Sequence, residues 1–165
     1  MRNIKSNGDI WTGDGDGSTN VFPPSISRNL YNENPLSMAF KISFGTFDYF
    51  TGGDMTGITG FGFPAWFDVE TPVAKVVGTV DAMTLNHHGM RDASNEFFLK
   101  TLAPQVIIQQ SWSSTIRVKQ HFIALFHLPR TRDHAIFSPR MCIAKQSLRM
   151  VDGLPTIINQ YVVIL

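Results

Sequence analysis

The sequence predicts an α/β fold with a mixed sheet, and three observations lead to this class. Residues 36–50 alternate apolar and polar side chains around a Gly45-Thr46 turn, which is typical of an antiparallel hairpin. Between residues 81 and 137, predicted strands alternate with predicted helices, as they do in layered α/β domains. Hydrophobic residues make up 43% of the 165 residues, which is enough for a core, so wholesale disorder is not expected.

The first 35 residues differ in character from the rest of the chain. Residues 1–35 are rich in Gly, Asn, Asp, Ser and Pro, and this composition favours turns and irregular chain over packed elements. We therefore expect a loop segment over 1–35 and the folded domain over 36–165.

The folded part begins with the predicted hairpin, whose strands cover residues 36–44 and 47–50. The second strand leads into a tight turn that ends in an acid, Thr51-Gly52-Gly53-Asp54. Residues 61–64 are then expected to form a loop. Residues 66–77 are expected to form a helix, which Pro72 must start or interrupt.

The rest of the chain predicts alternating elements. A short strand over 81–85 leads to Asn86-His87-His88-Gly89, and an amphipathic helix follows, with Asp92 or Ser94 as its N-cap. The remaining expected elements are that helix over 94–102, a buried strand over 106–108, a helix over 118–128, a strand over 135–137 and a final strand in the tail, 156–165.

Charge and cysteine content narrow the function classes. Lys and Arg total 14 and Asp and Glu total 13, so a net charge of +1 argues against a strongly basic nucleic-acid module. The single cysteine, Cys142, rules out an internal disulfide framework and fits a reducing compartment. No apolar run reaches the roughly 18 residues of a membrane span, and residues 1–6 do not lead into an apolar signal core. We therefore expect a cytoplasmic location without a membrane segment.

Two groups at predicted strand ends are candidates for chemistry. Asp54 follows one strand, and His87 and His88 follow another. Carboxylate oxygen and imidazole nitrogen suit zinc, and also manganese or iron, and strand ends fix ligand positions. Each signal alone has a simpler reading, because an Asp in a turn is usually a turn former and a His pair on a loop is usually surface.

The joint pattern is similar to a known family. The residues that carry the similarity are Phe50-Thr51-Gly52-Gly53-Asp54, the run from Val80 to Ser94 around His87-His88-Gly89, Leu102-Ala103-Pro104 before the strand at Val106, and Asn32 to Ser37 with an Asn-x-x-Ser pattern. Over residues 30–138 the chain resembles the metallo-β-lactamase superfamily, in its branch of DNA-uptake competence proteins of the ComEC type. The resemblance implies an αββα sandwich with two metal ions at one edge between the sheets.

The resemblance also implies roles for the candidate residues. Asp54 would bridge two metal ions, normally zinc, and His88 would be the late histidine ligand because it directly precedes the Gly. His87 is the alternative ligand, and whichever histidine does not ligate would lie beside the ligands or the substrate. Such metals generate hydroxide from bound water and polarise the scissile bond of a phosphodiester or another ester. This reading predicts that Asp54 and His88 converge beside an open groove.

The sequence departs from the family pattern in its ligands. The His-x-His-x-Asp-His signature is absent, no histidine precedes His87, and Met90 stands where the family has Ser. Because catalytic zinc normally has three protein ligands, two hypotheses follow. The chain is the C-terminal part of a hydrolase that needs a missing N-terminal half or a partner chain, or it is a non-catalytic relative that acts as a binding or structural module.

Overall fold

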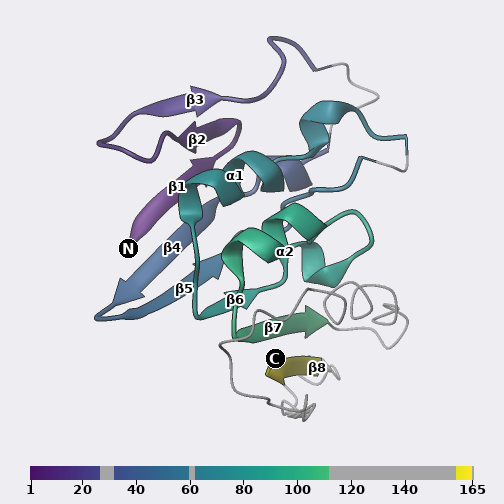
Figure 1. Ribbon diagram of the computed structural model, residues 1–165. Helices are drawn as coiled ribbons and strands as arrows, with labels where there is room; N and C mark the ends of the chain where they lie inside the picture. Colours follow the sequence, from purple (N-terminus) through teal and green to yellow (C-terminus); the bar gives the residue numbers. More distant parts are fainter. Residues whose placement is uncertain (27–31, 60–61, 112–158, 165) are drawn as a thin grey trace, which may run out of the picture.

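The described part of the chain forms one mixed sheet. The computed structural model describes residues 1–26, 32–59, 62–111 and 159–164, and within them eight strands follow the order β3-β2-β1-β4-β5-β6-β7-β8 (Figure 1). β5, β6 and β7 are parallel, and all other neighbours are antiparallel. The strands are β1 (Arg2–Ser6), β2 (Asp9–Trp11), β3 (Ser18–Asn20), β4 (Ala39–Phe44), β5 (Phe47–Thr51), β6 (Ala82–Thr84), β7 (Val106–Ser111) and β8 (Asn159–Ile164). The predicted α/β class with a mixed sheet is confirmed.

Two helices, α1 (Glu70–Val77) and α2 (Glu96–Leu102), pack side by side on one face of the sheet (Figure 1). Burial of apolar side chains between the helices and the sheet holds this layer in place. The core includes Ile4, Ile10, Ala39, Phe50, Met83 and Ile107 from the strands, and Val73, Ala74, Val77, Phe98, Leu99 and Leu102 from the helices. Three short 3-10 turns, η2 (Asn34–Leu36), η3 (Ala65–Phe67) and η4 (Asn86–Gly89), complete the described elements.

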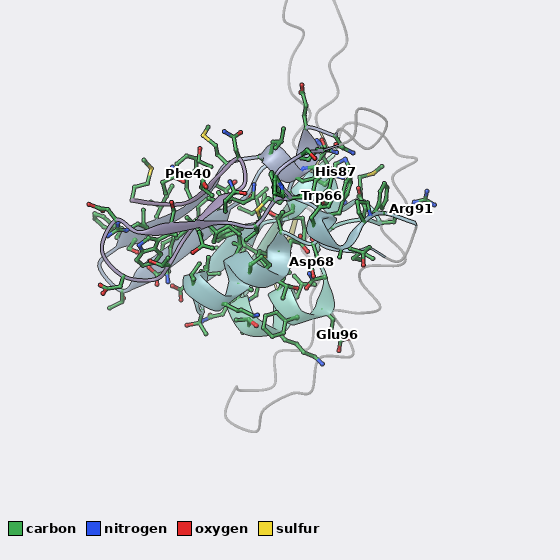
Figure 2. All side chains as sticks on the ribbon, turned by 90° about the horizontal axis from the view of Figure 1, so that it is seen from above. Phe40, Trp66, Asp68, His87, Arg91 and Glu96 are labelled. Carbon is green, nitrogen blue, oxygen red and sulfur yellow. The ribbon has the colours of Figure 1, made fainter. Side chains whose placement is uncertain are left out.

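The opposite face of the sheet exposes apolar side chains. In the β4–β5 hairpin, Ile42 is 39%, Phe44 86% and Phe47 48% exposed. Their strand register places them on the same side as Phe40, which Figure 2 shows away from the helical layer. The described residues thus form a sheet with helices on one face, and the second sheet of an αββα sandwich remains a proposal.

The expectation of a loop over residues 1–35 is wrong for three stretches, because β1, β2 and β3 lie there. Ile4 and Ile10 are 1% and 4% exposed and belong to the core. The turn-forming residues lie in the connections between these short strands. Backbone hydrogen bonds between β1 and β4 make the strands part of the main sheet. Composition averaged over 35 residues does not reveal three strands as short as these.

The central elements were largely predicted, with shifted ends. The hairpin, its Gly45-Thr46 turn and the turn before Asp54 are confirmed. The expected helix over 66–77 is divided into the turn η3 and helix α1. Pro72 lies in the first turn of α1, where its missing N–H is not needed. β7 is longer than predicted and ends at Ser111.

Helix α2 begins later than expected, and its N-cap is a different residue. Asn95, not Asp92 or Ser94, is the N-cap, because its side chain accepts a hydrogen bond from the backbone N–H of Phe98. The final strand is confirmed as β8. The predicted helix over 118–128 and strand over 135–137 lie outside the described residues. In the part of the chain that the structure describes, no helix is long and apolar enough to cross a membrane.

Candidate functional site

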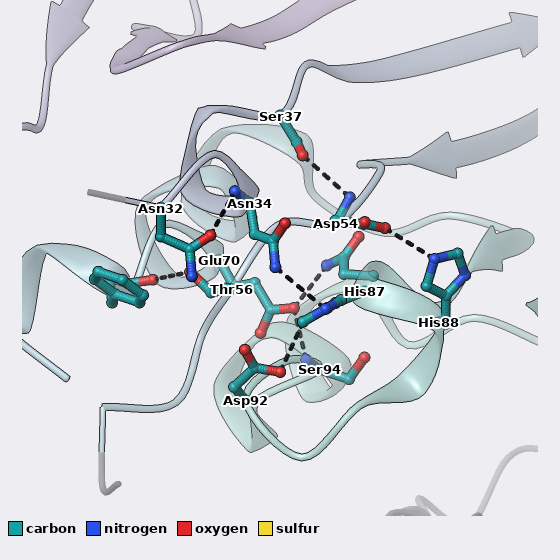
Figure 3. A network of polar contacts seen from close by, with 12 residues as sticks. Asn32, Asn34, Ser37, Asp54, Thr56, Glu70, His87, His88, Asp92 and Ser94 are labelled. Carbon is teal, nitrogen blue, oxygen red and sulfur yellow. Dashed lines mark hydrogen bonds and ion pairs between the residues drawn. The ribbon is translucent and has the colours of Figure 1, made fainter. Parts of the chain in front are cut away.

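Sheet topology brings the two predicted groups to one edge. β5 and β6 are parallel neighbours, with Phe50 paired to Met83, so the turns that follow them emerge together. Asp54 lies in the first turn and His88 in the second, and Asp54 Oδ1 is 3.4 Å from His88 Nε2 (Figure 3). The expected convergence of Asp54 and His88 is therefore observed. The open groove expected beside them stays a prediction.

The turn that carries Asp54 is fixed from two sides. Gly53 has a φ of 58°, a left-handed conformation that glycine adopts without strain. The backbone N–H of Asp54 donates to Ser37 Oγ at 3.1 Å, and the N–H of His87 donates to the carbonyl of Gly53 at 3.0 Å. The second bond joins the two turns directly. The carboxylate of Asp54 is left 40% exposed at the edge of the sheet.

The hydrogen bonds of His88 determine which of its nitrogens carries a proton. Nδ1 lies 2.9 Å from the carbonyl oxygen of Gln110, which can only accept, so Nδ1 must donate. In a neutral imidazole, Nε2 then carries the lone pair, and this nitrogen faces Asp54. Two acceptors that face each other repel, so the pair is stabilised by a proton or a metal ion between them.

His87 has a different environment from His88. Its Nδ1 is 2.8 Å from Asp92 Oδ1, and its Nε2 is 3.1 Å from the side-chain nitrogen of Asn34 (Figure 3). The hydrogen bond to Asp92 raises the pKa of His87. Burial alone would raise the pKa of Asp92, but the hydrogen bond and charge of His87 outweigh it, so that pKa is lowered. Both ring nitrogens of His87 thus have protein partners, and neither is directed at Asp54.

The site also contains a carboxylate that no sequence motif marked. Glu70, at the start of α1, is 0% exposed and forms no ion pair among the described residues. Instead it accepts hydrogen bonds from Asn86 Nδ2 and from the backbone N–H groups of Ser94 and Asn95, at 2.6, 2.6 and 2.7 Å. Burial raises the pKa of Glu70 to about 7, although these bonds act in the other direction and the charge of Asp68 adds to the rise.

This buried carboxyl makes stability depend on pH. Because its pKa is higher in the folded chain than in the unfolded one, the folded state binds the extra proton. Its contribution to stability is therefore full below pH 4.5 and lost as the pH rises through about 7. We expect the loss to reach as much as about 3 kcal/mol. Urea unfolding at several pH values measures it, and the Glu70→Gln variant, which cannot ionise, should lose that part of the pH dependence. An identical pH profile for both proteins would contradict the assignment.

Comparison of the chain with protein-family models, with curated proteins and with solved structures finds no match in any of the three. Within the described ranges, no group of three or more His, Cys, Asp or Glu side chains is arranged to hold a metal ion. The donors that converge at the sheet edge are Asp54 and His88.

Several residues of the site had only weak signals in the sequence. Asn34 and Ser37 belong to the Asn-x-x-Ser pattern, but only the structure shows that they contact His87 and Asp54. Asp92 was considered as a helix cap and is instead the partner of His87. Glu70 is one of only three Glu residues, and with the polar Asp68 and Thr71 close to it no local signal marked it as buried.

Proposed function

We propose that this chain is part of a metal-dependent hydrolase of the metallo-β-lactamase type, acting on a phosphodiester or another ester. The observation that carries the proposal is the approach of Asp54 and His88 to 3.4 Å from two turns that are 34 positions apart in the sequence. A carboxylate oxygen and an imidazole nitrogen that face each other are a donor set that suits zinc.

The types of donor atom at the site suit a metal ion, but a catalytic metal ion needs more protein ligands than these two. Asp54 and His88 would hold the ion, with Gln110 orienting the His88 ring through its backbone carbonyl. Two protein ligands are fewer than the three that catalytic zinc normally has. Further ligands would come from an additional polypeptide segment or from a partner chain. When bound, the metal would lower the pKa of a coordinated water and polarise the ester.

His87 and His88 have separate parts in this proposal. His88 directs its Nε2 at Asp54, whereas both ring nitrogens of His87 are engaged by Asp92 and Asn34. We therefore assign the metal to His88, and we place His87 beside it, where Asp92 and Asn34 fix its ring. The hydrogen bond to Asp92 favours the protonated form of His87.

The exposed apolar face of the β4–β5 hairpin supports the proposal that a further polypeptide layer packs against the sheet. Ile42, Phe44 and Phe47 project from the side of the sheet opposite to the two described helices. Apolar side chains clustered on a sheet face are typical of a surface that packs against another layer. The same feature favours the second candidate function, a non-catalytic binding module that works through this face.

Zinc titration of the chain separates the two functions. We expect the unmodified protein to bind zinc weakly, because two ligands are present, and we expect the Asp54→Ala and His88→Ala variants to weaken binding by at least about tenfold. Asp16→Ala is the matched control, since Asp16 is exposed and pairs with Arg2. His87→Ala should retain more affinity than His88→Ala.

The outcomes are distinct. No zinc binding by the unmodified chain at millimolar metal, or equal affinity in all variants, would reject the metal site and leave the binding module. A loss confined to Asp54→Ala and His87→Ala would keep the metal site but exchange the roles of the two histidines.

A further inference from the structure

Glu70 is positioned by the fold to bind both ends of one loop. Its Oε1 accepts from Asn86 Nδ2 and from the N–H of Ser94, and its Oε2 accepts from the N–H of Asn95. Asn86 begins the loop and Ser94 ends it, and between them lie His87, His88 and Asp92. One carboxylate therefore joins the two ends of the segment that carries the histidines of the site.

This loop needs such an anchor because its backbone is strained. His87, His88 and Ser94 have φ values of 45°, 57° and 59°, which place three residues other than glycine in the left-handed region. Each costs on the order of 1 kcal/mol or more relative to ordinary backbone conformations, and such residues persist only where the surroundings hold them. Three hydrogen bonds to one buried carboxyl group help to hold the two ends of the loop against this strain.

The loop is also held from a second segment that lies against Glu70. The N–H groups of Gly57 and Ile58 donate to the carbonyl of Asp92 at 2.8 and 3.0 Å. Gly57 approaches Glu70 so closely that a Cβ there would lie 1.8 Å from Oε2. Glu70 is thus enclosed between the 57–58 segment and the loop, and it cannot move away from its three donors.

We propose that Glu70 is a positioning residue, which sets the orientation of His87 and His88 toward Asp92 and Asp54 by holding loop 86–94 at both ends. The proposal rests on the proposed function only for its consequence on metal binding. The role itself concerns the geometry of the metal-free chain, and it can be tested there. The hydrogen bonds of Glu70 are to Asn86, Ser94 and Asn95, so it acts on the two histidines through these residues.

The test compares Glu70→Gln with Glu96→Gln. Both replace a carboxylate by an amide of the same shape, but Glu96 is exposed and pairs with Lys100 on the surface of α2. The amide at position 70 must direct an NH₂ group at one or more backbone or side-chain donors, so at least one of the three bonds is lost. We expect the ring ¹⁵N signals of His87 and His88 to shift toward a mixture of tautomers in Glu70→Gln, and to stay unchanged in Glu96→Gln.

Zinc affinity provides the second measurement. If the unmodified chain binds zinc ions, Glu70→Gln should weaken binding by about tenfold, because the loop would hold His88 less firmly toward Asp54, and Glu96→Gln should not. If the unmodified chain binds no zinc, the proposed function fails, while the histidine signals still decide the role of Glu70.

Unchanged histidine signals in a folded Glu70→Gln protein would overturn the proposal. Should that variant fail to fold, Asn86→Ala takes its place, because it removes one of the three bonds and leaves the carboxylate in position. The same shift of the His87 and His88 signals, at smaller extent, is then expected. Signals identical to those of the unmodified protein would again reject the positioning role.

Discussion

Replacing Gly57 by Ala should destabilise the fold by on the order of 4 kcal/mol. An added Cβ would lie 1.8 Å from Oε2 and 2.5 Å from Cδ of Glu70, and 2.8 Å from Asn95 Nδ2. Glu70 is wholly buried and held by three hydrogen bonds, so it can make room only by breaking them. Overpacking of about 1–3 kcal/mol then adds to the cost of unpaired buried donors, about 1–3 kcal/mol each. Urea unfolding followed by circular dichroism measures the loss.

Gly15→Ala is the control for the Gly57 substitution. No atom lies within 4 Å of the Cβ position at Gly15, and its φ of 51° predicts only the ordinary cost of a left-handed alanine, about 1 kcal/mol. If Gly57→Ala unfolds at the same urea concentration as Gly15→Ala, the close approach of Gly57 to Glu70 is wrong. A protein that folds with displaced histidine signals would instead show that Glu70 has moved.

Replacing Lys5 by Met should cost about 3–4 kcal/mol. Lys5 is 1% exposed, and its ammonium donates to the carbonyls of Asn7, Pro35 and Ser37, the last two at 2.5 and 2.8 Å. Burial lowers the pKa of Lys5 to about 8, so the group is still mainly charged at pH 7. Methionine has a similar length but no donor. It relieves the burial of a charge and leaves three carbonyls unpaired at about 1–3 kcal/mol each.

The effect of Lys5→Met should extend to the candidate site. Lys5 fixes the segment 35–37, and this segment supplies Ser37, which binds the N–H of Asp54. Lys75→Met is the matched control, since Lys75 is an exposed residue of α1. We expect thermal unfolding at a lower temperature for Lys5→Met only. A midpoint within about 2 °C of the Lys75→Met value would show that the three carbonyl bonds contribute little to stability.

The local sequence pattern was sufficient to predict the elements that have a clear hydrophobic periodicity. The β4–β5 hairpin, the strand before His87 and the strand at Val106 follow from alternation and apolar runs, because these patterns report burial directly. The position of Asp54 and His88 at strand ends was also readable. Parallel neighbours place such ends at one edge, so their approach to 3.4 Å was a consequence of topology that the sequence could suggest.

The N-terminal strands and the anchor of the site depended on contacts between distant segments. β1 forms because β4 lies beside it, and its Lys5 finds carbonyl partners 30 and 32 positions away. Glu70 accepts hydrogen bonds from groups 16 to 25 positions away, and the residues next to it in the sequence do not predict these partners. The sequence by itself determined the α/β class and the residue types at the strand ends, since these depend on short-range pattern. Only the tertiary structure decided which histidine faces Asp54 and which carboxylate holds the loop, because buried polar groups take their partners from the whole fold.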